Sequence, residues 1–223
     1  MAAPPFARKT QQALTFMAGF CDTATFIHVG GVFCAHVTGN FVLFAASIAR
    51  GLKTEDYLKV LTFPVFVMGV ILATHLIVRS MRGMTGAFST TLGTISALHW
   101  LAFLLSFTAL HSVDVTITLI LVVALGMQNT LHHFAPGPLT TVMTGTVMNT
   151  SANLTKKYLI RCESHEQQPQ PLPGLGMMAA FLLGCTFGAL GAFYGGFRYL
   201  VLPAAMSLWV AWSRARGESA SRD

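Results

Sequence analysis

Long runs of apolar residues, each about the length of a membrane crossing, follow one another along most of the chain. Residues 56–80 and 174–195 form two of these runs, and a helix needs about 20 mainly apolar residues to span a bilayer. Charged residues make up only 10% of the chain and hydrophobic residues 53%, whereas a soluble domain usually has about 25% charged residues. The sequence therefore predicts an all-α integral membrane protein.

Eight helical elements account for the apolar runs, and together they predict one transmembrane domain over residues 11–213. Short polar tails are expected at 1–10 and 214–223, and the polar, proline-rich stretch 161–174 is expected to be a flexible loop. The third element is expected to bend or open near Pro64. The predicted elements are 11–30, 33–50, 56–80, 87–110, 113–133, 138–158, 174–195 and 198–213.

An internal repeat divides the domain into two halves, 11–110 and 113–213. The tetrapeptide FVMG at 66–69 resembles FLLG at 181–184. The other aligned pairs are Gly19 with Gly126, Asp22 with Asn129, Thr23 with Thr130, Thr38 with Thr144 and Gly39 with Gly145. Because these features keep the same order in both halves, a repeat explains them better than chance does. Transporters and channels are commonly built this way, with a pathway between the halves.

Two topologies agree with the positive charges of the chain. If all eight elements cross, the halves are parallel, and 11 Lys or Arg residues lie inside against 3 outside. If the second and sixth elements enter only part-way, six helices cross, the halves are inverted, and the count is 10 against 4. Cytoplasmic loops collect Lys and Arg, so both topologies predict that both termini lie in the cytoplasm.

The sixth element is too polar to face lipid over much of its circumference. Between positions 138 and 156 it carries nine Thr, Ser or Asn residues, and such a helix must be buried, line water or enter the membrane only part-way. The second and sixth elements are therefore expected to be short or broken.

Asp22 is the only carboxylate well inside an apolar segment. A charge near the bilayer centre costs about 3 kcal/mol or more, so ionisable residues there usually have a function. Asp22 is accordingly a candidate for proton coupling, with His36 as a neighbouring pH-sensitive group and Gln128 and Asn129 as the counterpart in the second half. The alternative is a structural role, in which Asp22 locks the first helix to a neighbouring hydroxyl or backbone group.

Two threonine-glycine steps, Thr38-Gly39 and Thr144-Gly145, lie inside apolar segments. Glycine permits close backbone approach, and a helix that starts inside the membrane offers free N–H groups to a solute. With the side chains of Asn40 and Asn149, these steps predict a solute pathway near the membrane centre. Tight helix packing through small residues is the alternative interpretation.

Several other functions find little support in the sequence. Basic residues are scattered rather than gathered with aromatic ones, which argues against nucleic-acid binding. We expect no metal site, no cofactor and no enzymatic activity, because the chain lacks the common catalytic and metal-binding motifs. Glycines at helical spacing in 174–195 predict close packing, either within the chain or in a homo-oligomer. These glycines are Gly184, Gly188, Gly191 and Gly195.

The paired motifs resemble the YoaK-like family of bacterial membrane proteins. The resemblance is carried by FMAGFCDTATFIHVGGVFCAHVTGNFVLF at 16–44, GMQNTL at 126–131 and TTVMTGTVMNTSANL at 140–154. Thr23 departs from the family pattern, in which alanine is usual. The residues that match are Gly19, Phe20, Asp22, Gly30, Gly31, Phe33, Thr38, Gly39, Asn40, Gly126, Gln128, Asn129, Thr144, Gly145 and Thr146. The resemblance implies a multi-helix inner-membrane protein that transports a small molecule, without naming the substrate.

The sequence thus predicts a polytopic bundle of six to eight transmembrane elements that moves a small polar or singly charged solute between its two halves. Its expected partners are the lipid bilayer and this solute. Two alternatives remain open: a channel of the same architecture without coupling, and a membrane protein with a structural or assembly role.

Overall fold

A computed structural model describes residues 6–82, 86–108, 113–135, 143–156 and 172–220, and in these residues all the regular structure is helical. The helices are α1 (Arg8–His28), α2 (Val37–Arg50), α3 (Tyr57–Arg82), α4 (Ala87–Leu105), α5 (Val113–Phe134), α6 (Met143–Thr155), α7 (Leu172–Gly195) and α8 (Val201–Ala220). Two short 3₁₀ helices, η1 (Thr54–Asp56) and η3 (Gly196–Leu200), precede α3 and α8. The prediction of an all-α bundle is confirmed.

The eight expected elements are present, with differences at their ends. Helix α2 has 14 residues, which confirms that the second element is short. Helix α6 has 13 residues, and the ends of the predicted sixth element, 138–142 and 157–158, lie outside the described residues. Helix α8 runs to Ala220, beyond the predicted end at 213, because no helix breaker stands between Trp212 and Arg216. Helix α3 continues through Pro64. Residues 172–174 belong to α7, while the rest of the predicted loop 161–174 lies outside the described residues.

Four helical segments of the described chain are long and apolar enough to cross a membrane. They are residues 54–80, 88–105, 113–134 and 174–216, the last of which contains both α7 and α8. Helix α1 has 21 residues, or about 31 Å at 1.5 Å per residue, which also matches the thickness of a bilayer core. The protein is therefore a polytopic membrane protein.

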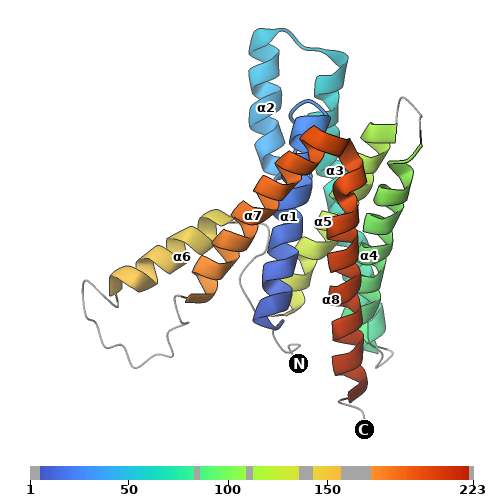
Figure 1. The fold of residues 1–223 in the computed structure, drawn as a ribbon, viewed down its shortest axis with the longest axis vertical. Helices are drawn as coiled ribbons and strands as arrows, with labels where there is room; N and C mark the ends of the chain where they lie inside the picture. Colours follow the sequence, from blue (N-terminus) through green and yellow to red (C-terminus); the bar gives the residue numbers. More distant parts are fainter. Residues whose placement is uncertain (1–5, 83–85, 109–112, 136–142, 157–171, 221–223) are drawn as a thin grey trace.

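One end of the molecule, at the top of Figure 1 and called here the upper end, gathers the ends of α1, α4 and α7 with the starts of α3, α5 and α8. At this end His28 Nε2 of α1 lies 3.4 Å from Asp114 Oδ2 of α5. The guanidinium of Arg198, just before α8, lies over the ring of Phe107, just after α4. The ring of His28 also packs on Phe197, which follows α7.

The opposite end, called the lower end, holds both chain termini (Figure 1). Phe6, just before α1, packs edge-to-face on Phe88 at the start of α4. The guanidinium of Arg214, near the end of α8, lies 5.3 Å from the centres of both rings. Helices α1, α4 and α7 therefore run from the lower to the upper end, and α3, α5 and α8 run back.

Direction decides between the two topologies predicted from the sequence. Helices α1 and α5 hold the same place in the repeat but run in opposite directions, and the same is true of α3 and α7, and of α4 and α8. The two halves are therefore inverted relative to each other, with six long helices between the two ends. Inverted repeats of this kind occur in many secondary transporters.

The pairing of helices also repeats. Helix α1 packs most extensively on α7, and α5, the counterpart of α1, packs most extensively on α3, the counterpart of α7. A methyl group on Gly19 of α1 would lie 2.6 Å from the carbonyl oxygen of Phe181 in α7. A methyl group on Gly126 of α5 would lie 2.5 Å from the carbonyl oxygen of Phe66 in α3. These residues are aligned in the repeat, so the two crossings are equivalent.

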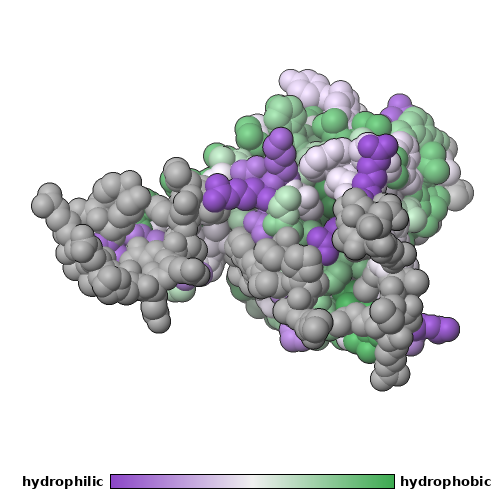
Figure 2. Space-filling model, turned by 90° about the horizontal axis from the view of Figure 1, so that it is seen from below, coloured by the Kyte–Doolittle hydropathy of each residue, from purple (hydrophilic) through white to green (hydrophobic). Residues whose placement is uncertain are grey.

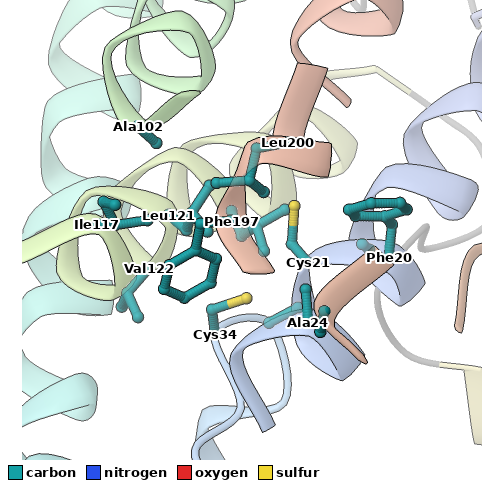
Figure 3. Close-up of a cluster of buried hydrophobic side chains, with 14 of the residues drawn as sticks. Phe20, Cys21, Ala24, Cys34, Ala102, Ile117, Leu121, Val122, Phe197 and Leu200 are labelled. Carbon is teal, nitrogen blue, oxygen red and sulfur yellow. The ribbon is translucent and has the colours of Figure 1, made fainter. Parts of the chain in front are cut away.

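Helices α1 and α5 form the centre of the bundle, and both carry long sets of buried residues. Figure 3 shows part of this core, in which Cys21 and Ala24 of α1 lie between Phe20 on one side and Leu121 and Val122 of α5 on the other. Cys34, from the connection between α1 and α2, is fully buried in the same cluster. The connection therefore turns back into the bundle before α2 begins.

Charge is distributed unequally between the two ends. Figure 2 looks onto the lower end and shows hydrophilic side chains beside an apolar surface. Described cations at this end are Arg8, Lys9, Arg79, Arg214 and Arg216. The carboxylates Glu55, Asp56 and Asp114 belong to segments at the upper end, together with the cations Arg50, Lys53, Lys59 and Arg198. Glu218 belongs to α8, which ends at the lower end. Among the described residues, the lower end is therefore the more basic of the two.

Candidate functional site

Asp22 lies in α1, six residues before the upper end of that helix, and only 3% of the residue is exposed. Its Oδ1 accepts hydrogen bonds from the backbone N–H groups of Cys34 at 2.8 Å and Ala35 at 2.6 Å, and a longer one from His36 at 3.4 Å. The side chain thereby holds the turn in front of α2 at its own depth, about 9 Å below the end of α1.

His36 completes this arrangement, because its Nδ1 forms a short hydrogen bond or ion pair with Oδ2 of Asp22. The side chain of His36 is 37% exposed, whereas that of Asp22 is 4% exposed. The pair therefore has one member in the core and one member that solvent can reach. We call Asp22, His36 and the backbone of residues 34–36 the Asp22 site.

Aromatic and sulfur-containing side chains surround the Asp22 site. The ring of His36 packs against Phe181 of α7 and Phe33, with centroids 5.7 Å and 6.3 Å away. On the α7 side, Cys185 Sγ lies close to Gly19, in contact with α1. This site is consequently built where the two halves meet, since α1 belongs to the first half and α7 to the second.

Asn40 fixes the same turn from the other side. It is fully buried, and its amide pairs with the backbone of Phe33 by accepting from N–H at 2.8 Å and donating to C=O at 2.7 Å. Its Nδ2 also donates to Thr62 Oγ1 of α3 at 2.9 Å. The amide is thus engaged in holding α2, α3 and the turn together. Thr62 could not be recognised from the sequence as a partner of Asn40, because it comes from another helix.

The first threonine-glycine step stands at the start of α2. Thr38 is exposed, and Gly39 lies against the ring of Phe33, which a methyl group would approach to 3.3 Å. The glycine is therefore explained by the close approach of the turn to α2. Thr38 is the second residue of α2, two residues beyond that turn.

The second step occupies the corresponding place in α6. Thr144 and Asn149 are exposed, and a methyl group on Gly145 would meet no atom within 4 Å. The buried side of α6 instead carries Thr146 and Thr150, whose spacing of four residues places them on one helix face. That spacing was visible in the sequence and points to the packed face of α6 more directly than the repeat does.

The two threonine-glycine steps lie in two different pairs of packed helices. Helix α2 packs on α3 and α6 packs on α7, and in the described residues α2 and α6 do not form a packed pair. Of the predicted site residues, the structure thus brings Asp22, His36 and, through the shared turn, Asn40 together. It does not bring Thr38 and Thr144 together in one helix pair.

Gln128 and Asn129, predicted as the counterpart of Asp22, have different surroundings. Gln128 is fully buried, and its Nε2 donates to the carbonyl oxygen of Leu14 in α1 at 3.0 Å, which ties α5 to α1. Asn129 is half-buried and lines a groove of about 600 Å³ between α3 and α5. We call this the Asn129 groove; its lining includes Val70, Thr74, Asn129, Thr130, His132 and His133.

The Asn129 groove is the repeat equivalent of the Asp22 site. Asn129 aligns with Asp22, and Val70, the residue after FVMG, aligns with Cys185, the residue after FLLG. In the first half, the Asp22 carboxylate holds the turn before α2 against the wall formed by α1 and α7. In the second half, the corresponding wall of α5 and α3 borders a groove that carries amide, hydroxyl and imidazole groups. The segment before α6, which corresponds to the turn before α2, lies outside the described residues. Among the described residues, equivalent positions thus carry a carboxylate in one half and an amide in the other.

No set of three or more His, Cys, Asp or Glu side chains with the geometry of a metal site occurs in the part of the chain that the structure describes. The polar chemistry of the two sites is that of one carboxylate, imidazoles, amides and hydroxyls. Such groups can bind a small polar molecule or exchange a proton.

Comparisons with known proteins agree with these observations. A family model described as "Protein of unknown function (DUF1275)" matches residues 12–213. A relative from Bacillus subtilis (strain 168), the UPF0700 transmembrane protein YoaK, is 22% identical over 168 residues, which cover 72% of this chain and 73% of the relative. No solved structure matches the chain.

Proposed function

The chain belongs to the DUF1275 family, as its resemblance to YoaK-like proteins predicted, and we propose that it transports a small polar or singly charged solute across the bacterial inner membrane. The pathway lies between the two halves, with both termini in the cytoplasm. We propose no catalytic activity for this protein.

One observation carries the proposal: a membrane bundle of two inverted halves has equivalent polar sites, one holding a buried carboxylate. A buried ionisable residue in a membrane protein is costly and usually marks a solute, ion or proton pathway. Inverted repeats place such sites at the interface of the halves, near the midplane. The Asp22 site lies at this interface, because α1 and α7 come from different halves.

Proton coupling follows from the geometry of the Asp22 site. The carboxylate accepts N–H groups of residues 34–36 on one oxygen and contacts His36 on the other. These bonds are strongest when Asp22 is ionised. A proton that reaches the pair through the exposed ring of His36 weakens them and frees the turn in front of α2. The start of α2 would thereby respond to protonation.

Solute chemistry follows from the groups that line the pathway. Asn129, Thr74 and the imidazoles of His132 and His133 offer hydrogen bonds in the Asn129 groove. Thr38, Thr144 and Asn149 present further hydroxyl and amide groups on exposed faces of α2 and α6. Neutral donors and acceptors suit a polar or singly charged solute better than a highly charged one.

A flux assay in proteoliposomes tests this function. Purified protein is reconstituted, a pH gradient is imposed, and uptake is measured for a panel of neutral, monoanionic and monocationic solutes. We expect the wild type to accumulate at least one solute above its external concentration. Asp22→Asn should allow that solute only to equilibrate, because the amide cannot release a proton.

Matched variants separate the alternatives. Asp114→Asn removes an exposed carboxylate at the upper end and should leave accumulation unchanged. Thr38→Val and Thr144→Val should slow flux, whereas Thr90→Val, at an exposed threonine of α4, should not. A flux rate that changes neither with the pH gradient nor in the Asp22→Asn variant would indicate a channel. If no solute of the panel moves, the transport proposal is wrong and a structural or assembly role is favoured.

A further inference from the structure

A second groove lies on the outer face of α3 and is separate from the Asp22 site. It has a volume of about 660 Å³. We call it the α3 groove, and it is lined by Val70, Ile71, Thr74, His75, Val78 and Arg79. These residues follow the spacing of three and four that places side chains on one helix face. Ile71, His75, Val78 and Arg79 are all exposed in the protein chain itself.

The bilayer is what covers this face of α3. The segment 54–80 is one of the four that are long and apolar enough to span the membrane. Val70 stands at the middle of α3, and Arg79 stands three residues before its lower end. The groove between them extends about 14 Å along the helix, close to half of a hydrocarbon core of about 30 Å. It therefore has the length of an acyl chain in one leaflet.

Charge determines which lipid the groove suits. The groove begins near the membrane centre with Val70 and Ile71 and continues past Thr74 and His75. It ends with Val78 and Arg79 at its lower end, where a headgroup would be. None of its lining residues is acidic. The lower end also carries Arg8, Lys9, Arg214 and Arg216 among the described residues. Basic residues at the edge of a membrane span favour anionic headgroups.

We infer that the α3 groove is a binding site for an anionic phospholipid of the leaflet at the lower end. One acyl chain lies along Val70, Ile71 and Val78, and the phosphate contacts Arg79 and His75. The α3 groove shares Val70 and Thr74 with the Asn129 groove, so the lipid borders the groove that we assign to the solute. The inference itself depends only on lipid contact and stands whether or not the protein transports a solute.

Native mass spectrometry tests the site directly. The full-length protein is reconstituted in nanodiscs of equimolar phosphatidylglycerol and phosphatidylcholine, and the lipids that remain bound after release are counted. We expect the wild type to retain phosphatidylglycerol in preference to phosphatidylcholine. Arg79→Gln should lower this preference about fivefold, since one basic residue near the surface contributes about that factor, and Arg79→Gln with His75→Gln should lower it further.

Arg50→Gln is the matched control, because Arg50 is an exposed arginine at the upper end of α2. It should leave the preference unchanged. An equal loss of the phosphatidylglycerol preference in Arg50→Gln and Arg79→Gln would show that the preference depends only on net charge, and it would overturn the inference. A wild type without this preference would also overturn it.

Quenching by lipids with brominated acyl chains locates the bound chain. In an Ile71→Trp variant, brominated phosphatidylglycerol should quench the added fluorescence more strongly than brominated phosphatidylcholine does. Equal quenching by the two lipids would contradict a selective site at this groove. A spectrum of the variant that is typical of the folded protein would exclude loss of structure as the reason for equal quenching.

Discussion

At the scale of single residues, Asp22 shows how one side chain can build a local structure and still be available for chemistry. Its carboxylate accepts the backbone N–H groups of Cys34 and Ala35 and contacts the ring of His36. Cys34 and Ala35 are both buried. The structural and the functional interpretations of Asp22 therefore coexist, because the bonds that hold the turn are the ones that protonation would weaken.

Removing the acceptor should destabilise the protein. In Asp22→Ala, two buried N–H groups lose their acceptor, and each costs about 1–3 kcal/mol, so we expect a loss of about 2–6 kcal/mol. Asp22→Asn keeps one side-chain oxygen and should lose clearly less. Thermal unfolding in detergent measures both. Asp114→Ala, which breaks an exposed pair with His28, should cost less than about 1 kcal/mol; a comparable loss there would refute the special role of the turn.

At the scale of helices, glycines set how closely α1 and α7, and α3 and α5, can cross. A methyl group on Gly184 would collide with the carbonyl oxygen of Phe16, and one on its repeat equivalent Gly69 with that of Val123. Gly188 faces Phe20 in the same way, while Gly191 and Gly195 lie against Tyr199. The glycines of α7 thus serve packing within the chain, which was one of the two roles expected from the sequence.

Alanine at the crossings should separate the helices. We expect Gly184→Ala and Gly69→Ala each to destabilise the protein by about 1–3 kcal/mol, because the added methyl group overpacks a backbone contact. Gly93→Ala in α4 is the control, since a methyl group there meets nothing within 4 Å, and it should gain about 0.5–1 kcal/mol through helix propensity. Unfolding in detergent again provides the measurement. Similar effects at all three positions would argue against tight crossings.

At the scale of the whole molecule, the alternation of six long helices places both termini at one end, where the described basic residues outnumber the acidic ones. The upper end has the described carboxylates Glu55, Asp56 and Asp114, and Asp56 forms a buried pair with Lys59. Positive charge next to a transmembrane segment stays on the cytoplasmic side. We therefore expect the lower end to face the cytoplasm.

Cysteine labelling in cells tests this orientation. In a variant whose native cysteines are replaced by alanine, Lys53→Cys lies at the upper end and Ser80→Cys near the lower end. A membrane-impermeant maleimide should label Lys53→Cys in intact cells and Ser80→Cys only after the membrane is opened. The reverse pattern would invert the orientation, and labelling of both positions from outside would contradict the span 54–80.

Several features could be predicted from the sequence because they depend on composition or on order along the chain. Uninterrupted apolar runs require helices that satisfy their own backbone hydrogen bonds in lipid, so the all-α class and the positions of the eight elements followed. The repeat followed from the order of Gly19, Asp22 and Thr38 and their counterparts. The importance of Asp22 followed from the cost of a charge in an apolar segment.

Other features depended on contacts between distant residues and only the tertiary structure decided them. A close crossing at glycines depends on the surfaces of both helices that meet there. Helix α1 pairs in this way with α7 rather than with its neighbour in the sequence, α2. The partners of Asp22 and Asn40 are backbone groups of residues 33–36, and backbone groups leave no pattern in a sequence. The two topologies had nearly equal charge counts, so the choice came from the direction of α5 against α1, which the packing of the bundle fixes.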